Sequence, residues 1–288
     1  AAVSKTAGRG FEPCCPCQSS RRRLAMRPLP ADRQGAMTQN IYDDETFFAG
    51  YSQLARSVHG LDGAPEWPVL RAMLPVLSGR HVLDLGCGFG WFCRFAAGEG
   101  AASVLGVDVS EKMLERARRE TADARITYQR ADLERFAPPA GRFDLAYSSL
   151  AFHYLADLAG LLGRVHAALK PGGVLVCSVE HPLMTAPARQ EWLIDADGRA
   201  AWPVNGYLDE GRRVSNWLAE GVVKRHRTLA TYLDLMLEAG FAPTKLVEWA
   251  PSAEQVAAEP GWAKERERPF FLLMSLQRGR SIPAKGLG

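Results

Sequence analysis

The chain has 288 residues, 47% of them hydrophobic, which is enough to bury one large core with at most a small addition. Lysine and arginine exceed aspartate and glutamate by only 35 to 32, and a net charge of +3 is too weak to favour a nucleic-acid partner. No apolar run approaches the ~20 residues that a membrane-spanning helix needs, so no membrane partner is predicted.

Residues 1–36 differ in composition from the rest, being rich in Arg, Gly, Pro and Ser without any helical or strand period. We predict a disordered basic leader there, a domain over 37–278 and a flexible tail over 279–288. An organelle transit peptide and extra upstream sequence are both compatible with this leader, the second being the simpler reading. Its three thiols (Cys14, Cys15, Cys17) lack a nearby His, so no metal site is predicted. The cysteines of the chain do not suggest a set of disulfides, which favours a location in the reducing cytoplasm.

Beyond Met37, aromatic residues from Tyr42 onwards at roughly helical spacing predict a helical start, after which apolar runs alternate with segments of helical period. Strands are predicted near 81–85, 103–107, 126–129, 143–147 and 174–179, with helices from about 89, from about 110 and near 157–169. This alternation predicts an α/β fold whose parallel sheet is covered by helices on both faces.

The alternation fails over 181–227, where Gly, Pro and four aromatics (Trp192, Trp202, Tyr207, Trp217) predict an irregular insertion. A helix at 228–239 and strands near 244–249 and 270–276 follow. Ligands of such sheets bind beyond the carboxyl ends of the strands, and the insertion follows one of these ends. We therefore interpret it as a lid or substrate pocket, although its aromatics would also serve as a core of its own.

The most informative segment is 82–90, an apolar run that breaks into Gly86, Gly88 and Gly90, followed by a second run that ends at Asp108. Glycines let a backbone approach a ligand closely, and an acid ending a strand accepts ribose hydroxyls. The pattern predicts an adenosine-containing cofactor. It does not match the dinucleotide spacing G-x-G-x-x-G, because position 91 is Trp91, but Asp108 would also suit a nicotinamide enzyme.

Three further features accompany the glycines: Asp84 before them, Asp132 after the third predicted strand, and Leu-Lys-Pro-Gly-Gly at 169–173. Together these motifs, in this order over about 40–180, resemble the class I S-adenosylmethionine-dependent methyltransferases. The resemblance is to the small-molecule branch (type 11 methyltransferase domain) that includes ubiquinone and menaquinone C-methyltransferase-like enzymes. It implies a Rossmann-like, doubly wound sheet of seven strands whose last strand is antiparallel, with S-adenosyl-L-methionine as cofactor.

The resemblance also implies roles for single residues. Gly86, Gly88 and Gly90 would leave room for the methionine and ribose moieties, Asp84 would orient the amino-acid end, and Asp108 would accept the ribose hydroxyls. The remaining expected cofactor contacts are Val109 and Met113 on adenine, Asp132 and the Leu133 backbone at the adenine edge, and Ser148 near the methionine moiety. Met113 would equally suit a helix core, and Ser148 a turn.

Methyl transfer needs a base only if the acceptor must lose a proton. Candidates near the strand ends are His153, Glu180 and His181, each as a base or a substrate ligand, with capping or packing as the structural alternative. Ser-Ser-Leu-Ala at 148–151 lacks the Asn/Asp-Pro-Pro-aromatic pattern of enzymes that methylate base amines. We expect a small-molecule acceptor that is methylated at oxygen, nitrogen or carbon. Two other functions stay open for the chain: a nicotinamide-dependent oxidoreductase and a non-catalytic subunit that binds the cofactor. The oligomeric state is not indicated.

Overall fold

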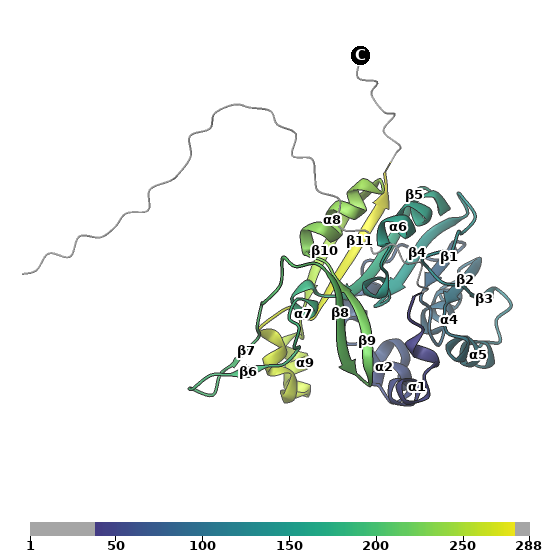
Figure 1. Ribbon diagram of the computed structural model, residues 1–288. Helices are drawn as coiled ribbons and strands as arrows, with labels where there is room; N and C mark the ends of the chain where they lie inside the picture. Colours follow the sequence, from purple (N-terminus) through teal and green to yellow (C-terminus); the bar gives the residue numbers. More distant parts are fainter. Residues whose placement is uncertain (1–37, 280–288) are drawn as a thin grey trace, which may run out of the picture. The chain divides into compact units, whose positions relative to one another are not determined.

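The structure is a computed structural model in which residues 38–279 are described. The predicted leader, with its three cysteines, and all but the first residue of the predicted tail lie outside the described residues. A seven-stranded sheet forms the centre (Figure 1). Its strands are β1 (His81–Leu85), β2 (Ser103–Asp108), β3 (Ile126–Arg130), β4 (Phe143–Ser149), β5 (Leu169–Glu180), β10 (Phe241–Trp249) and β11 (Phe271–Arg278).

The spatial order of the strands is β10-β11-β5-β4-β1-β2-β3. Pairing is parallel from β5 through β4, β1 and β2 to β3, whereas β11 lies antiparallel between β5 and β10. The prediction of a mostly parallel seven-stranded sheet with an antiparallel last strand is therefore confirmed. Because the parallel strands run the same way, the ends of β1, β2, β4 and β5 meet at one edge of the sheet.

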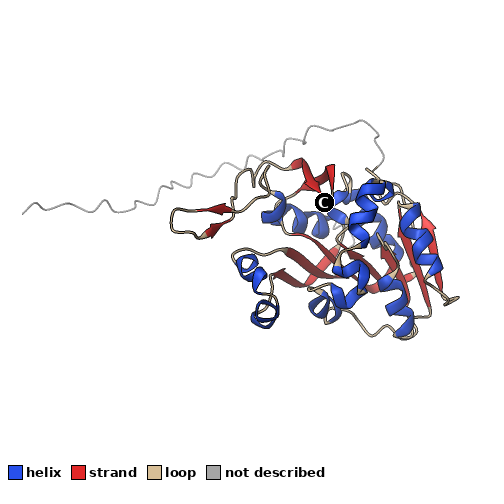
Figure 2. Ribbon diagram, turned by 90° about the horizontal axis from the view of Figure 1, so that it is seen from below, coloured by secondary structure: helices blue, strands red, loops and turns tan. Residues whose placement is uncertain are grey.

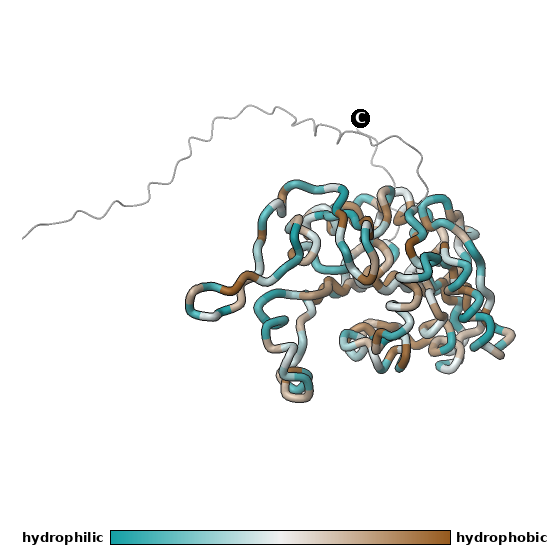
Figure 3. Tube along the Cα trace, turned by 60° about the horizontal axis from the view of Figure 1, so that its bottom comes forward, coloured by the Kyte–Doolittle hydropathy of each residue, from teal (hydrophilic) through white to brown (hydrophobic). Residues whose placement is uncertain are grey.

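Helices cover both faces of the sheet, as Figure 2 shows. Successive strand residues point to opposite faces, so Val82 packs into one hydrophobic cluster and Leu83 into the other. Figure 3 shows the hydrophobic stretches mainly in the interior. One face is covered by α6 (Leu158–Ala168) and α8 (Leu229–Glu238), and the other by α3 (Trp67–Arg71), α4 (Trp91–Gly98) and α5 (Glu111–Arg119).

Local signals account for these helix boundaries. The Ser110 hydroxyl accepts the Met113 N–H at 3.1 Å, and this cap begins α5 where the sequence predicted a helix. The Asp157 carboxylate accepts the Gly160 N–H at 2.9 Å and begins α6 in the same way. At the other end, α8 stops before Gly240, whose φ of 91° suits a residue without a side chain.

Short helices precede the sheet: α1 (Glu45–Ser52), α2 (Ala55–Val58) and the 3-10 turns η1 (Ile41–Asp43) and η2 (Gly60–Gly63). Two more, α9 (Ala253–Ala258) and η4 (Pro260–Arg266), lie between β10 and β11 and were not predicted. Along the described part of the chain, no helix has the length and apolar character needed to cross a bilayer.

The segment predicted as irregular is more ordered than its composition suggests. After α7 (Pro182–Thr185) and the small hairpin β6 (Leu193–Ile194) with β7 (Ala200–Ala201), it forms the antiparallel hairpin of β8 (Gly211–Trp217) and β9 (Ala219–His226). The buried positions of β9 alternate as Val222, Lys224 and His226, so two of three are polar and no hydrophobic period is visible. Its turn uses Leu218 at φ 61° rather than glycine, which removes the usual turn signal.

Helix α4 packs closely on β2 at Gly106. A Cβ atom at this position would lie 2.8 Å from both Cys93 Sγ and Tyr128 Cδ1, and these neighbours are held by the helix and the next strand. We expect Gly106→Ala to lower the free energy of unfolding by about 1–3 kcal/mol through this overlap.

Gly163→Ala is the matched control, because Gly163 is exposed on α6 and a Cβ there meets nothing within 4 Å. It should raise the free energy of unfolding by about 0.5–1 kcal/mol. Denaturant titration of both variants checks the pair; equal effects would mean that β2 and α4 do not approach each other as described.

Candidate functional site

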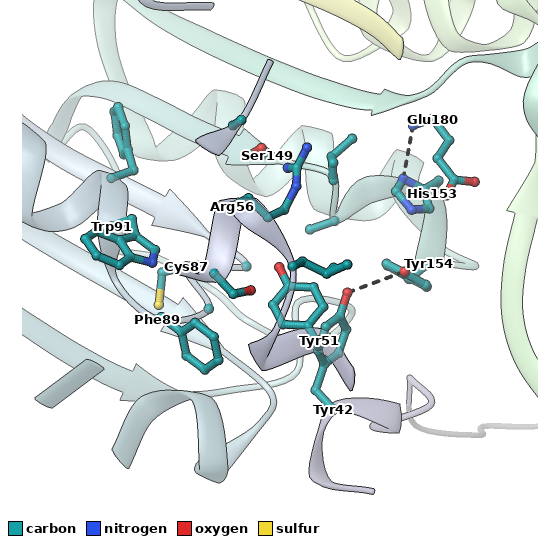
Figure 4. Close-up of a pocket in the computed structure, with 18 of the residues that line it drawn as sticks. Tyr42, Tyr51, Arg56, Cys87, Phe89, Trp91, Ser149, His153, Tyr154 and Glu180 are labelled. Atoms are coloured by element: carbon teal, nitrogen blue, oxygen red, sulfur yellow. Dashed lines mark hydrogen bonds between the residues drawn. The ribbon is translucent and has the colours of Figure 1, made fainter. Parts of the chain in front are cut away.

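A cavity of about 510 Å³ lies at the edge of the sheet where the parallel strands end. This volume falls within the ~300–1,000 Å³ range of small-ligand sites. Its walls come from the short N-terminal helices, the loop after β1, the ends of β2, β4 and β5, and the β8–β9 hairpin. Figure 4 shows side chains from several of these segments pointing into it.

The loop after β1 forms one wall without presenting bulky side chains at its glycines. Gly86, Gly88 and Gly90 have φ values of 78°, 50° and 73°, a region that favours glycine. A Cβ at Gly86 would lie 2.6 Å from Ala151 Cβ, and one at Gly90 would overlap the Tyr128 hydroxyl. A Cβ at Gly88 would meet nothing within 4 Å, because Gly88 borders the cavity. Backbone is therefore what a ligand meets here.

Asp108 ends β2 and lines the cavity while only 8% exposed. Its Oδ2 accepts the Gly88 N–H at 2.9 Å, and its Oδ1 accepts the Ser110 N–H at 2.9 Å. Burial raises the pKa of Asp108, an effect that these backbone N–H groups oppose. An ionised carboxylate accepts about four hydrogen bonds, so about two remain available for a ligand.

Asp84, the last but one residue of β1, is also buried and lines the cavity. The Cys93 thiol donates to its Oδ2 at 3.2 Å. Burial raises the pKa of Asp84 to about 7, so this carboxyl is easily protonated near neutral pH. A cationic group of a ligand placed next to it would favour the ionised form.

Four further predicted cofactor residues line the same cavity: Val109, Met113, Asp132 and Leu133. Met113 is also part of the buried face of α5, so it combines packing with a place on the cavity wall. Asp132 accepts the Thr38 hydroxyl at 2.7 Å, the Thr38 N–H at 3.2 Å and the Glu134 N–H at 3.0 Å. A ligand at the Asp132 carboxylate would share it with these partners.

Two predicted catalytic candidates meet at the opposite end of the cavity, where Figure 4 shows His153 and Glu180 far from Cys87 and Phe89. His153 lies in the 3-10 turn η3 (Phe152–Tyr154), and burial lowers its pKa to about 4, so the imidazole is neutral at neutral pH. Its Nδ1 accepts the Glu180 N–H at 3.4 Å, which leaves the proton of the neutral ring on Nε2.

Glu180 ends β5, and its Oε1 accepts from Lys224 Nζ at 2.5 Å. Burial by itself would raise the pKa of Glu180, but the ammonium group of Lys224 brings it below its ordinary value. The carboxylate is therefore ionised at neutral pH, and its charge is balanced by a lysine that the hairpin supplies.

Three predicted residues do not line the cavity: Gly90, Ser148 and His181. Gly90 is the N-cap of α4, and Ser148 is fully buried with its hydroxyl donating to the Leu85 carbonyl at 2.8 Å. Because side chains alternate along a strand, the neighbour Ser149 faces the cavity instead. His181 caps α7, its Nδ1 accepting the Leu183 N–H at 3.1 Å.

Several cavity residues were not found from the sequence. Tyr42, Tyr51 and Arg56 enter from the N-terminal helices, and Lys224 enters from β9 (Figure 4 labels the first three). The Arg56 guanidinium pairs with the buried Glu66 carboxylate at 3.1 Å. The sequence signal was limited to the helical spacing of the aromatics, which is equally typical of an ordinary packing face.

Of the insertion's four aromatics, only Trp217 lines the cavity. Trp192 and Trp202 lie on the Arg268 guanidinium, at 4.9 and 4.0 Å from its carbon to the ring centres. Tyr207 packs against His226. Three of the four therefore hold the insertion in place, and its side chains that reach the cavity are Met184, Gln190, Trp217 and Lys224.

Comparisons with known proteins indicate the family of the chain. Residues 82–173 match the family model described as a methyltransferase domain. An S-adenosylmethionine-dependent methyltransferase from Mesorhizobium loti, known from a crystal structure, is 56% identical in sequence to this chain. The two structures align with a TM-score of 0.74, and the alignment covers 76% of this chain and all of the Mesorhizobium loti chain. An uncharacterized protein of Haemophilus influenzae is 34% identical in sequence to this chain. The alignment covers 83% of this chain and 97% of the Haemophilus influenzae protein.

A trans-aconitate 2-methyltransferase of Variovorax paradoxus is 34% identical over 154 residues, which are 49% of this chain and 59% of that enzyme. The residues on the cavity wall fit the cofactor of these enzymes: Asp108 has hydrogen-bonding capacity left for ribose, and Gly88 offers bare backbone beside it. The cofactor is S-adenosylmethionine rather than a nicotinamide dinucleotide. The chain belongs to the S-adenosylmethionine-dependent methyltransferases.

Proposed function

We propose that this enzyme methylates a small-molecule acceptor that binds in the same cavity as the cofactor. The observation that carries the proposal is that one cavity contains two different ends. The cofactor motif, with the glycine loop and Asp108, forms one end, and His153, Tyr154 and Glu180 form the other. A cavity of about 510 Å³ suits a small molecule better than a macromolecular surface.

On the cofactor side, we assign the roles residue by residue. Asp108 accepts the two ribose hydroxyls with the capacity that Gly88 and Ser110 leave free. Asp84 binds the ammonium group of the methionine moiety. Val109 and Met113 pack on the adenine, while Asp132 and the Leu133 backbone bind its polar edge. Gly90 acts indirectly, by allowing α4 to begin close to Tyr128.

S-adenosylmethionine supplies an electrophilic methyl group on a sulfonium. In-line displacement from such a group depends on positioning and on exclusion of water, which the walls of the cavity provide. With its proton on Nε2, His153 is suited to donate a hydrogen bond to the acceptor rather than to remove a proton from it. We therefore assign His153 and Glu180 to acceptor binding, and we leave His181 and Ser148 with their capping and packing contacts.

The acceptor itself is not identified by the comparisons. The alignment covers 59% of the trans-aconitate 2-methyltransferase, so its acceptor is not transferred to this chain. The resemblance to the ubiquinone and menaquinone branch likewise stays a prediction.

Asp108→Asn tests the cofactor assignment, because it keeps the shape of the side chain and removes its charge. Two hydrogen bonds to an ionised carboxylate contribute roughly 3 kcal/mol or more, so S-adenosylhomocysteine should bind about 100-fold more weakly. Isothermal titration calorimetry measures this. Asp234→Asn, at an exposed position on α8, is the matched control and should bind like the wild type. Equal affinities for all three proteins would refute the role of Asp108.

Asp84 gives a pH-dependent test. Its folded-state pKa of about 7 lies above the ordinary value, so the free enzyme holds a proton there below pH 7. Binding of an ammonium group favours the ionised form, so the affinity for S-adenosylhomocysteine should rise from pH 6 to about pH 7 and then level off. Titration in two buffers of different ionisation enthalpy measures the released proton. Asp84→Asn should abolish the release; a variant that still releases it would contradict the assignment.

A further inference from the structure

Two consecutive residues, Thr38 and Gln39, connect the two ends of the cavity and take no part in the proposed function. Both line the cavity, just before the 3-10 turn η1. Thr38 binds Asp132 at the cofactor end, whereas Gln39 binds the β8–β9 hairpin. This hairpin supplies Trp217 and Lys224 to the acceptor end. A single peptide bond therefore links a residue of the cofactor end to a wall of the acceptor end.

The side-chain amide of Gln39 takes the place of a neighbouring strand on β9. Its Nε2 donates to the Gly221 carbonyl at 3.0 Å, and its Oε1 accepts the Val223 N–H at 2.8 Å. Within residues 38–279, β9 pairs with β8 alone, so the backbone groups on its other edge need partners from elsewhere. Two hydrogen bonds to residues two positions apart fix both the place and the direction of this edge.

The hairpin depends on such contacts, because an isolated pair of strands is only marginally stable in water. At its tip, Trp217 packs on Phe47 of α1 with 5.5 Å between ring centres, and Figure 1 shows the tip beside α1. Gln39 holds a different part of the hairpin, at Val223, and the next residue is Lys224. Packing thus fixes the tip, while Gln39 fixes the strand from which Lys224 enters the cavity.

Asp132 has room for Thr38 and for a ligand at the same time. It is partly buried and lines the cavity, so a ligand can reach its carboxylate. The carboxylate accepts two hydrogen bonds from Thr38 and one from the Glu134 N–H, whereas an ionised carboxylate accepts about four. One position is left for the exocyclic amine of adenine, which the proposed function places there. An adenine in this position holds the carboxylate from the other side, and Thr38 is held with it.

A second attachment fixes the chain on the other side of Gln39. Asp43 Oδ1 accepts the Ser110 hydroxyl at 2.5 Å and the Lys112 N–H at 3.2 Å, both at the start of α5. Gln39 therefore lies between two points that are tied to the cofactor end. Its own side chain is the contact that extends from this segment to β9.

We propose that Gln39 is a positioning residue that couples cofactor binding to the wall of the acceptor end. Adenine at Asp132 fixes Thr38, and Thr38 in turn fixes Gln39. Gln39 then fixes the hairpin, and with it Lys224 and Trp217. The acceptor end takes its final form only when the cofactor is bound. This inference rests on the proposed function, since it requires adenine to bind at Asp132.

Hydrogen–deuterium exchange of the full chain, with and without saturating S-adenosylhomocysteine, tests the coupling. In the wild type, S-adenosylhomocysteine should slow exchange over 211–226 about fivefold or more, and it should also protect the glycine loop that it contacts. In Gln39→Ala the glycine loop should keep its protection. Exchange over 211–226 should instead be fast and should no longer respond to S-adenosylhomocysteine.

Gln277→Ala is the matched control. Gln277 is exposed on β11, away from the cavity, and its amide also donates to a distant carbonyl, that of Gly172 at 3.5 Å. The variant should respond to S-adenosylhomocysteine like the wild type. Thr38→Val removes the hydroxyl bond to Asp132 and leaves Gln39 in place, so it should weaken the response over 211–226. An undiminished response in Thr38→Val would overturn the path through Asp132.

A purely structural role of Gln39 gives a different result. Exchange over 211–226 would then be faster in Gln39→Ala, but S-adenosylhomocysteine would slow it by the same factor as in the wild type, and this outcome would overturn the proposal. Coupling is reciprocal, so Gln39→Ala should also bind S-adenosylhomocysteine about fivefold more weakly in calorimetry. Wild-type affinity in this variant would likewise count against the proposal.

The wild type separates the possible failures. A wild type that does not bind S-adenosylhomocysteine, or that binds it without protection of the glycine loop, would refute the proposed function. A wild type that binds it and protects the glycine loop, but whose exchange over 211–226 does not change, would refute only the role of Gln39.

Discussion

The carboxylate of Asp108 connects the three segments that form the cofactor end of the cavity. One oxygen accepts an N–H from the glycine loop after β1, and the other accepts the N–H of Ser110, which begins α5. Asp108 itself is fixed by the parallel pairing of β2 with β3, in which it lies opposite Arg130. The conformation of the loop, the start of the helix and the end of the strand therefore depend on one buried carboxylate. Asp108 also lines the cavity, where its remaining hydrogen-bonding capacity is available to a ligand.

The acceptor end is built on a different physical basis. Its polar groups are held by ion pairs: Arg56 with Glu66 joins α2 to the start of α3, and Lys224 with Glu180 joins the insertion to the sheet. Burying such pairs costs desolvation energy that their attraction barely offsets. The aromatic groups around them, among them Trp217 with Phe47 at 5.5 Å between ring centres, supply the apolar contact that closes this end. Packing of these aromatic groups therefore offsets the cost of burying the two ion pairs.

Much of the fold followed from local patterns in the sequence. The five strands from β1 to β5 and the starts of α4, α5 and α6 depend on apolar runs, glycine turns and capping residues, which act within a few residues. The features that the sequence did not reveal depend on partners far along the chain. The β8–β9 hairpin buries Lys224 and His226, so its pattern is not hydrophobic, and Lys224 meets Glu180 only after folding. At the end of β4, Ser149 lines the cavity in place of the predicted Ser148, because neighbouring strand residues face opposite sides.

The central claim is that the cofactor and the acceptor occupy opposite ends of one cavity. A crystal structure of the full chain with S-adenosylhomocysteine tests this most directly. The account predicts both ribose hydroxyls on Asp108, with the space between the cofactor sulfur and Glu180 still open for an acceptor. A ribose bound away from Asp108, or a cofactor that fills the end lined by His153, Glu180 and Lys224, would contradict it.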